Sequence, residues 1–254
     1  MLKIENTKTV GWEEAVRGMR NPMNSWGNSD SGWDTDYFNT TDYDSRVYVD
    51  YDGVDSYFLG PNDVNLMMKL RDAGTDHRKF MRMITVYMDI TAPLYWWKEF
   101  DTYKVGTVAN SCSTMHKISA KEFTLDDFSH EHLLKWDCEM ADAFELVATT
   151  EDGKELSEGC CSFGYLTTTI RVLNFYRDRY IKTKDKKYWW QMIQLLPSSY
   201  NQRRTVMLNY EVLANMYKSR KDHKLDEWHS FCDEIRAMPY SELIIGGGID
   251  CCAQ

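Results

Sequence analysis

Residues 80–90 are dense in Met, aromatic and β-branched side chains, and Pro93 breaks the segment that they form. Such a segment needs a hydrophobic core around it, as a buried strand or a buried helix, and periodicity alone leaves both open. The chain can supply that core, because 254 residues bury ~70–75% of their unfolded surface on folding. It therefore needs no disulfide or metal to fold, and at ~150 residues per domain it makes one large domain or two small ones.

Helical signals lie on both sides of this segment. Residues 64–73 follow Pro61 and precede Gly74, which predicts a capped helix. Apolar residues at helical spacing predict three further helices, over 133–148, 163–180 and 202–220. We expect residues 1–20 to enter the core as a strand or short helix, residues 151–158 to form a turn, and the basic stretch 177–187 to be a solvated connection.

Residues 21–63 differ in composition from the rest of the chain. Nine aspartates and a single basic residue, Arg46, are interleaved with aromatic side chains. The D-x-D spacings suggest calcium, but the twelve-residue loop with its Gly and terminal Glu is missing. We expect an acidic, partly ordered surface insertion with a short hairpin strand at 46–51. The expected domain spans residues 1–240 and includes this insertion, and residues 241–254 are expected to form a flexible tail.

The formal net charge of −9 argues against a duplex nucleic-acid binder, which needs a basic balance. A mononucleotide stays open as a ligand, because a few local donors can hold one phosphate. The sequence contains no run of 18 apolar residues, so we expect no membrane span. Residues 1–12 do not have the pattern of a signal peptide. The seven cysteines have no framework spacing, so we expect free thiols and a cytoplasmic localisation.

Generic catalytic motifs are absent. The chain has no G-x-x-x-x-G-K-[ST], G-x-G-x-x-G, G-x-S-x-G or H-E-x-x-H pattern. His130-Glu131-His132 puts two imidazoles two residues apart, which does not suit one helix face. We expect an exposed helix start there, and no metal site.

Two segments carry polar residues inside apolar surroundings. The first runs from Phe80 through Ala92-Pro93-Leu94-Tyr95 to Met115, and the second from Leu196-Pro197 to Trp228. Together they resemble the flavin-dependent thymidylate synthases. In that family A-P-[IL]-F leads into R-H-R-x-x-S-x-N-x-x-S-x-R, and a later L-P segment leads into a helix with two asparagines and R-x-D. The resemblance covers residues 80–115 and 196–228 and has no gap from 196 to 220.

This resemblance implies an α/β (α+β) domain of one sheet and helices, assembled as a homotetramer with active sites shared between subunits. It implies FAD as the cofactor, NADPH and methylenetetrahydrofolate as co-substrates, and transfer of a one-carbon unit to C5 of dUMP. The cofactors carry that chemistry, so no protein nucleophile is required.

The resemblance also implies roles for individual residues. Arg220 is the expected catalytic residue, because it matches the family arginine that contacts the pyrimidine and would stabilise charge developing on the ring. The expected cofactor contacts are Asn209 and Asn215 on the flavin ring, with Tyr103, Lys104, Thr107, Asn110 and Arg82 elsewhere on FAD. The expected substrate contacts, besides Arg220, are Glu99, Ser111 and Ser113.

The chain departs from the family where phosphates are held. R-H-R is replaced by Thr102-Tyr103-Lys104, Glu99 stands where the family has glutamine, and Ile193 and Glu211 stand where it has arginine. Each lost charge contact typically costs ~2–5 kcal/mol of binding. The residues that could replace the arginines are Lys98, Lys104, Arg82, Arg203 and Arg204. We therefore expect a planar-ring pocket whose ligand or chemistry has changed.

Three functions remain open from the sequence. The first is an enzyme that transfers a one-carbon unit to C5 of dUMP or of a related, less charged pyrimidine nucleotide. The alternative is a non-catalytic nucleotide-binding protein, regulatory or sequestering, on the same fold. The third is an interaction protein that binds a partner through residues 21–63.

Overall fold

The computed structural model describes residues 2–34, 48–51, 55–135, 148–149, 155–156 and 161–246. Helices and strands are mixed along the chain, which confirms the expected α/β (α+β) class. The chain divides into two compact units. One comprises Thr91–Lys98 and Ser111–Arg203, and the other comprises Leu2–Ile90, Glu99–Asn110 and Arg204–Gln254.

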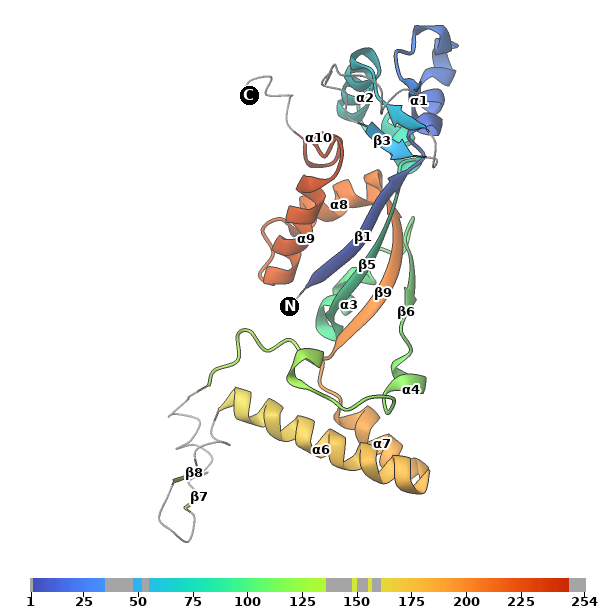
Figure 1. Cartoon of the computed structure of the whole chain (residues 1–254). Coiled ribbons are helices and arrows are strands. Elements are labelled where there is room, and N and C mark those ends of the chain that lie inside the picture. Colours follow the sequence, from blue (N-terminus) through green and yellow to red (C-terminus); the bar gives the residue numbers. More distant parts are fainter. Residues whose placement is uncertain are drawn as a thin grey trace, which may run out of the picture. The chain divides into compact units, whose positions relative to one another are not determined.

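The strands form three sheets (Figure 1). A four-stranded sheet has the order β1-β5-β9-β6, an antiparallel three-stranded sheet has the order β2-β4-β3, and β7 pairs with β8. The strands are β1 (Lys3–Val10), β2 (Gly32–Asp34), β3 (Tyr48–Tyr51), β4 (Ser56–Phe58), β5 (Thr85–Pro93), β6 (Val108–Ser111), β7 (Ala148–Thr149), β8 (Glu155–Leu156) and β9 (Asn201–Asn209).

The helices vary widely in length. The α-helices are α1 (Trp12–Arg20), α2 (Pro61–Asp72), α3 (Leu94–Phe100), α4 (Thr114–Lys117), α6 (Ser162–Thr183), α7 (Lys186–Leu195), α8 (Tyr210–Arg220), α9 (Asp226–Ala237) and α10 (Glu242–Ile245). Short 3-10 helices are η1 (Asn21–Met23), η2 (Trp26–Asn28), η3 (Arg78–Arg82) and η4 (Leu125–Asp127).

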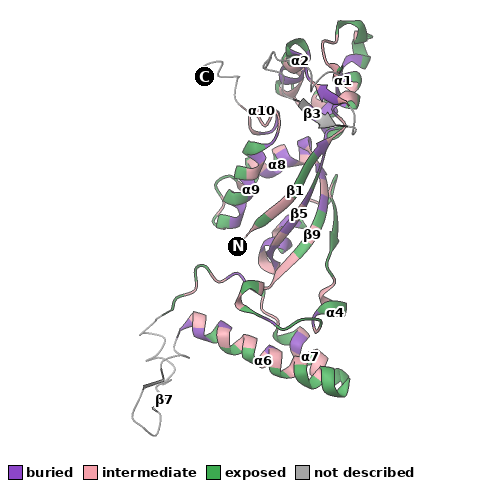
Figure 2. Cartoon of the chain, in the orientation of Figure 1, coloured by how far each residue is buried: buried purple, intermediate pink, exposed green. Residues whose placement is uncertain are grey.

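Most of the segment 80–90, for which the sequence left strand or helix undecided, is a strand. In β5 the side chains of Val86, Met88, Ile90 and Ala92 are buried and alternate with less buried positions (Figure 2). Alternation with a period of two is the geometry of a strand, whose successive side chains point to opposite faces. The preceding residues 78–82 form η3 instead.

The predicted helix over 202–220 is wrong in its first half. Residues 201–209 form β9, in which Val206 and Leu208 are buried, and only residues 210–220 form a helix, α8. The break is made by Asn209, whose side-chain oxygen accepts a hydrogen bond from the backbone N–H of Val212 at 3.0 Å. This is an N-cap, which starts a helix and leaves its own residue extended. The helical spacing from Val206 to Tyr210 was therefore coincidental.

Other predicted elements have mixed outcomes. The helices over 64–73 and 163–180 are confirmed as α2 and α6, and residues 1–20 form both a strand and a helix. The basic stretch 177–187 is not a connection, because α6 continues to Thr183 and α7 begins at Lys186. The Asp185 side chain caps α7 by accepting from the backbone N–H of Lys187 at 3.0 Å.

The middle of the chain differs from its prediction where it is described. Residues 133–135 are not helical and residues 148–149 form β7, so both described ends of the predicted helix 133–148 are wrong; the rest lies outside the described residues. In the predicted turn 151–158, residues 155–156 form β8 and the others lie outside the described residues. No helix begins at His130, whose Nδ1 lies 2.8 Å from the Phe128 carbonyl oxygen.

Each compact unit has its own core. In the unit that holds α6 and α7, the core residues are Ile118, Phe123, Phe128, Leu166, Leu173 and Met192. In the other unit, Trp12 and Tyr210 pack edge to face at 5.2 Å between ring centroids, and so do Trp228 and Phe231 at 5.7 Å. These four rings are fully buried, and they hold α8 and α9 in place.

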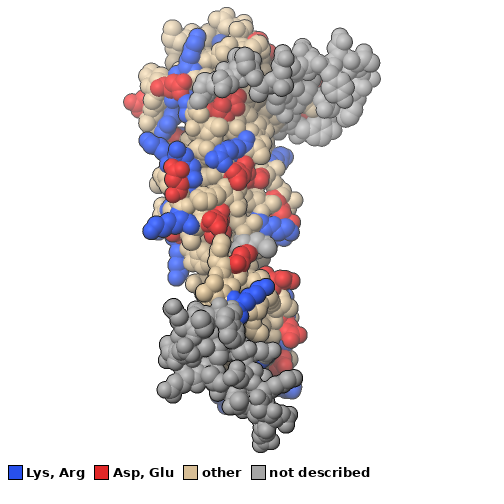
Figure 3. Space-filling model, turned by 90° about the vertical axis from the view of Figure 1, so that its left-hand side faces the viewer, with Lys and Arg blue, Asp and Glu red and all other residues tan. Residues whose placement is uncertain are grey.

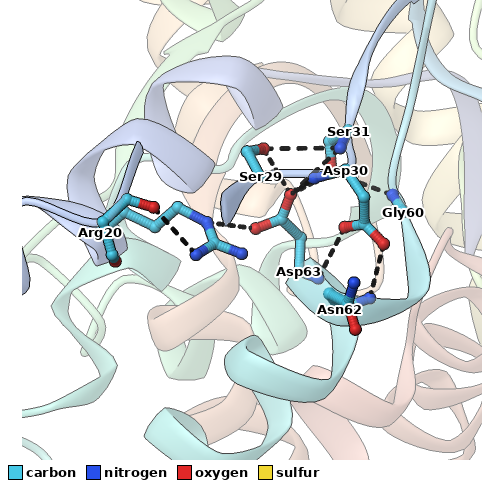
Figure 4. Close-up of polar contacts among 8 residues, drawn as sticks. Arg20, Ser29, Asp30, Ser31, Gly60, Asn62 and Asp63 are labelled. Atoms are coloured by element: carbon cyan, nitrogen blue, oxygen red, sulfur yellow. Dashed lines mark hydrogen bonds and ion pairs between the residues drawn. The ribbon is translucent and has the colours of Figure 1, made fainter. Parts of the chain in front are cut away.

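The expected surface insertion is anchored in the core at its end (Figure 4). Asp63 is fully buried and accepts hydrogen bonds from Arg20 Nε at 2.6 Å and from the hydroxyls of Ser29 at 2.6 Å and Ser31 at 2.7 Å. Burial alone would raise the pKa of the Asp63 carboxyl, but these hydrogen bonds and the Arg20 charge lower it. The prediction of a surface segment is therefore wrong for this end, while 35–47 and 52–54 lie outside the described residues.

The predicted C-terminal tail starts too early. Residues 242–245 form α10, where Leu243 and Ile244 are buried, and Arg71 Nε donates to the Leu243 carbonyl oxygen at 3.0 Å. Burial of the apolar side chains Leu243 and Ile244 stabilises this turn of helix, and α10 as a whole contacts α2, α8 and α9. Residues 247–254 lie outside the described residues.

Helix hydropathy, surface charge and the exposure of β6 are described next because they bear on function. Within the described ranges, no helix is both long and apolar enough to span a membrane. Figure 3 displays one face of the molecule, on which acidic and basic side chains are interspersed. All four residues of β6 are exposed (Figure 2).

Candidate functional site

Arg220, the last residue of α8, is held by contacts on three sides. Its Nε donates to the Tyr103 hydroxyl at 2.9 Å, and its Nη1 donates to Glu99 Oε2 at 2.6 Å. Its guanidinium also lies over the rings of Trp228 and Tyr103, at 4.7 and 5.5 Å from the centroids. A guanidinium packed against two aromatic rings and fixed by two hydrogen bonds is preorganised to meet a ligand.

Glu99 contacts three other residues of this cluster through one carboxylate oxygen. Its Oε2 accepts hydrogen bonds from Arg220 Nη1 and from Trp228 Nε1, the latter at 3.1 Å, and His223 Nε2 lies 3.1 Å from the same oxygen. Glu99 and these three residues come from the end of α3, the end of α8, the turn after α8, and α9. Sequence reasoning assigned no role to His223 or Trp228. Their position just after Arg220 could have pointed to them, because the resembling family has a tryptophan in this part of the segment.

A cavity of about 340 Å³ adjoins the cluster. Its lining residues are Phe100, Asp101, Tyr103, Lys104, Thr107 and Ala109, so Tyr103 belongs to both the cavity and the Arg220 cluster. Lys104 is exposed and brings a positive charge to the wall. The Thr107 hydroxyl is buried and has no hydrogen-bond partner among the described residues. Because buried hydroxyls are nearly always paired, an unpaired one in a cavity wall indicates a ligand position.

Asn209 packs against the loop that lines this cavity. Gly106 has a φ of +77°, and a Cβ placed on it would lie 3.0 Å from Asn209 Nδ2 and 3.0 Å from Val212 Cγ2. Glycine is therefore required there on two counts, because the left-handed region and the close approach both disfavour a side chain. The structure thus brings four predicted cofactor residues together in one place, namely Asn209, Tyr103, Lys104 and Thr107.

Other predicted site residues stand apart from this cluster. Asn215 is exposed on α8, and Asn110 and Ser111 are exposed on β6; within the described ranges none of the three side chains makes a hydrogen bond. Ser113 lies in the other compact unit, where its hydroxyl caps α4 by accepting from the His116 backbone N–H at 3.2 Å.

A second cavity, of about 260 Å³, lies in that other unit. Its lining includes Ser113 together with Thr91, Cys112, Thr114, Lys117, Lys121, Asp126, Asp127, Tyr200, Asn201, Gln202 and Arg203. Of the cations considered as replacements for the lost arginines, only Arg203 is among these residues. Lys121 pairs with Asp127, so part of its charge is already balanced.

Arg82 is engaged by a carboxylate. Its Nε pairs with Glu211, which is buried, and Arg78 Nε donates to the same carboxylate at 3.3 Å. Burial alone would raise the pKa of Glu211, but the hydrogen bonds and charges of Arg82 and Arg78 lower it. The carboxylate that replaced an arginine of the family pattern thus has two arginines as partners. Arg204 is engaged in the same way, by Asp101 at 2.7 Å.

In the part of the chain that the structure describes, no three His, Cys, Asp or Glu side chains are arranged to hold a metal ion. The cluster and the adjoining cavity wall contribute the Arg220 guanidinium, the carboxylates of Glu99 and Asp101, Lys104 and several neutral hydrogen-bonding groups.

Solved structures similar to this chain support the fold. No protein-family model and no curated protein sequence matches it. A crystal structure of thymidylate synthase X (ThyX) from Helicobacter pylori with FAD and dUMP is 13% identical with a TM-score of 0.58, over 96% of both chains. A second structure of that enzyme with the same ligands is 13% identical with a TM-score of 0.56, over 94% of this chain and 96% of that one.

A third similar structure is that of an enzyme with a related activity. The UMP/dUMP methylase PolB from Streptomyces cacaoi, bound with 5-Br UMP, is 13% identical with a TM-score of 0.52, over 96% of this chain and 92% of that one. At this identity the likeness bears on the fold and not on the activity. The chain has the fold of the flavin-dependent thymidylate synthases.

Proposed function

We propose that this protein is a flavin-dependent thymidylate synthase-like enzyme, which transfers a one-carbon unit to C5 of dUMP or of a related pyrimidine nucleotide. The observation that carries the proposal is the fixed Arg220 guanidinium beside a cavity lined by Tyr103, Lys104 and Thr107. The catalytic arginine expected from the resemblance is thus next to three of the expected cofactor residues.

The cavity residues fit a flavin cofactor. The unpaired Thr107 hydroxyl offers a donor or acceptor, Lys104 offers a charge for a phosphate, and Asn209 packs against the loop that carries both. We propose that these three residues hold FAD, which supplies the redox chemistry of the reaction when bound. NADPH and methylenetetrahydrofolate stay predictions from the resemblance.

Within this proposal, Arg220 has the central chemical role. Its remaining N–H groups would donate to a carbonyl oxygen of the pyrimidine and stabilise negative charge that develops on the ring. The rings of Tyr103 and Trp228 both lie against the guanidinium, so little reorganisation is needed when the ligand arrives. Glu99 orients the same guanidinium from its edge.

The first experiment measures flavin binding. The purified protein is examined by visible absorbance, and the chromophore released by heat is compared with FAD and FMN standards. We expect bound FAD, or uptake of added FAD with a shift of the flavin band. Absence of both would contradict the flavin-dependent reaction.

The second experiment tests the role of Arg220. Arg220→Ala is expected to reduce methyl transfer to dUMP by at least about 100-fold, since one well-placed donor to developing charge is worth ~2.7–4 kcal/mol, while FAD stays bound. The control is Arg236→Ala, because Arg236 also donates to a tyrosine hydroxyl, at 3.1 Å from Tyr217, and pairs with a carboxylate, that of Asp233. Equal activity of the two variants would contradict the assignment.

One observation favours the alternative, a non-catalytic nucleotide-binding protein. Arg82 and Arg204 are both engaged by carboxylates of this chain, which leaves Lys104 as the cation in the wall of the cavity near Arg220. A protein that binds a nucleotide without flavin would need no more. A colourless protein that takes up no FAD but still binds dUMP would support this alternative.

We also propose a homotetramer, as the resemblance implies. Light scattering of the purified protein coupled to size-exclusion chromatography gives the mass directly. A mass near four times 29.9 kDa is expected, and a monomer would contradict active sites shared between subunits.

A further inference from the structure

A cavity of about 200 Å³ lies among α1, η2, β2 and β4, within one compact unit. Three aromatic side chains, Trp26, Trp33 and Tyr57, are among the residues that line it. None of the residues expected to bind a flavin or a pyrimidine belongs to this lining. The cavity is therefore distinct from the one beside Arg220, and the function proposed above does not use it.

The two tryptophans offer this cavity ring surface and no free hydrogen-bonding group. Trp33 Nε1 donates to Glu13 Oε2 at 3.0 Å, and Trp26 Nε1 donates to Asn21 Oδ1 at 2.8 Å. An indole has no other polar atom. Trp33 and Tyr57 pair across β2 and β4, with ring centroids 5.1 Å apart and ring planes at 61°. Trp26 is 50% exposed and Trp33 is 38% exposed, and accessible aromatic surface beside a cavity favours a ligand that covers it.

Tyr57 adds a hydroxyl that the protein does not use. Tyr57 is only 3% exposed, and its hydroxyl makes no hydrogen bond in the described part of the chain. The oxygen is not one of the fully enclosed unpaired atoms, so part of the small accessible surface of Tyr57 is at that oxygen. Burial, together with the carboxylates of Asp63 and Glu13, raises the pKa of Tyr57, so the hydroxyl keeps its proton at neutral pH and can donate. Because a buried tyrosine hydroxyl usually has a partner, this one indicates the position of a ligand's hydrogen-bond acceptor.

The charged side chains of the cavity wall are already paired. Arg17 Nη2 lies 2.8 Å from Glu13 Oε1, and Arg20 Nε lies 2.6 Å from Asp63 Oδ1. Glu13, Arg17 and Arg20 are the charged residues of the described lining, so each charge there has an opposite charge beside it. An ionic ligand needs an unshared opposite charge to offset the loss of its hydration. This wall therefore suits an uncharged ligand.

Part of the wall is fixed before any ligand arrives. Arg20, Ser29 and Ser31 line the cavity, and all three also donate to the buried carboxylate of Asp63 (Figure 4). The two hydroxyls lie 2.6 and 2.7 Å from its Oδ2. A wall that is already ordered lowers the entropic cost of binding.

We propose that this cavity binds a small, uncharged, planar aromatic molecule that bears a hydrogen-bond acceptor. Its ring would pack against Trp26 and Trp33, and its acceptor would receive the Tyr57 hydroxyl proton. The volume of about 200 Å³ suits a molecule smaller than a typical drug, whose pockets start at about 300 Å³. The site shares no lining residue with the cavity beside Arg220, so the proposal goes beyond the proposed function and does not depend on it.

The test measures binding of benzamide to the full-length protein by ligand-observed NMR titration. Benzamide has one planar ring and one neutral carbonyl acceptor. We expect a Kd on the order of 1 mM or tighter. Three matched probes should bind at least about fivefold more weakly: benzoate adds a negative charge, benzylamine adds a positive charge, and cyclohexanecarboxamide replaces the planar ring. Equal or tighter binding of any of the three would overturn the ligand class.

Two cavity variants locate the binding. Tyr57→Phe keeps the ring and removes the hydroxyl, so the affinity for benzamide should fall about threefold to tenfold. Trp26→Ala removes an accessible ring and should lower the affinity at least about tenfold. The controls are Tyr87→Phe and Trp190→Ala, at residues 42% and 43% exposed outside this lining, and they should change the Kd less than about twofold. Unchanged affinity in both cavity variants, or no binding to the wild type, would overturn the inference.

Thermal unfolding separates lost binding from lost folding. Because the Tyr57 hydroxyl has no partner among the described residues, Tyr57→Phe should unfold at the wild-type Tm or above it when benzamide is absent. Benzamide should raise the Tm of the wild type and of Tyr87→Phe more than that of Tyr57→Phe. A Tm of Tyr57→Phe well below that of the wild type would show that the hydroxyl serves the folded protein and would overturn the inference. A protein that takes up no flavin would contradict the proposed function and leave this result unaffected.

Discussion

Two of the arginine–carboxylate pairs in the same compact unit, Arg20–Asp63 and Arg220–Glu99, differ in how far their hydrogen-bonding groups are used. Asp63 is fully buried and each of its carboxylate oxygens is used, by Arg20 on one side and by Ser29 and Ser31 on the other (Figure 4). Glu99 is partly exposed and uses one oxygen, while its partner Arg220 keeps a free Nη2. The closed cluster is complete without a ligand, and the open cluster is not. Saturation of hydrogen bonds therefore separates a structural ion pair from a candidate binding site.

The largest expected effect is on the closed cluster. Asp63→Asn removes the charge opposite a buried Arg20, and breaking a buried pair from one side costs about 3–5 kcal/mol. Urea unfolding at neutral pH measures the loss. Ser29→Ala is the control, because it removes one hydrogen bond and should cost about 1 kcal/mol. A loss below that of the control would place Asp63 among ordinary surface carboxylates and end the comparison.

The next effect is acid sensitivity. Burial would raise the pKa of Asp63, but its hydrogen bonds and Arg20 lower it. A carboxyl with a lowered folded-state pKa stabilises the protein above its unfolded pKa of ~3.9, and this contribution is lost as pH falls through the folded value. Thermal unfolding between neutral pH and pH 3 should show a steeper loss for the wild type than for Asp63→Asn. Parallel curves for the two proteins would show that Asp63 does not carry the effect.

The two clusters also differ in what sequence could reveal. Local signals sufficed for α2 and α6, where spacing and caps lie within one segment. Asp63 was taken as a surface residue because acidic composition dominated its neighbourhood, while its partner Arg20 is 43 residues away. Arg220 and Glu99 were identified as site residues because the resemblance covers both segments. Their direct contact across 121 residues, and the part of His223 in it, depend on tertiary structure that spacing does not encode.

A third prediction concerns Gly106, in the loop that lies against Asn209 and Val212 at the start of α8. Gly106→Ala should cost about 1–2 kcal/mol, because a φ of +77° is unfavourable for alanine and its Cβ would press on Asn209. Gly27→Ala is the control, since a Cβ there meets nothing within 4 Å. The free energy of unfolding of both variants is measured in urea, and their FAD binding is measured in parallel. An unchanged stability would show that the loop yields easily and that Asn209 is not held by it.

The smallest expected effect on stability is at the open cluster itself. Arg220 and Glu99 are 16% and 34% exposed, and partly exposed ion pairs contribute about 0–1 kcal/mol. Arg220→Ala and Glu99→Gln should each change the free energy of unfolding by less than about 1 kcal/mol, and a double-mutant cycle should give a coupling of the same size. The same variants should have their large effects on ligand affinity instead. If urea unfolding gave a coupling as large as that of Arg20 and Asp63, the open oxygen of Glu99 would be incidental to a structural pair. Small coupling with a large change in pyrimidine affinity would instead show that the pair is maintained for its ligand.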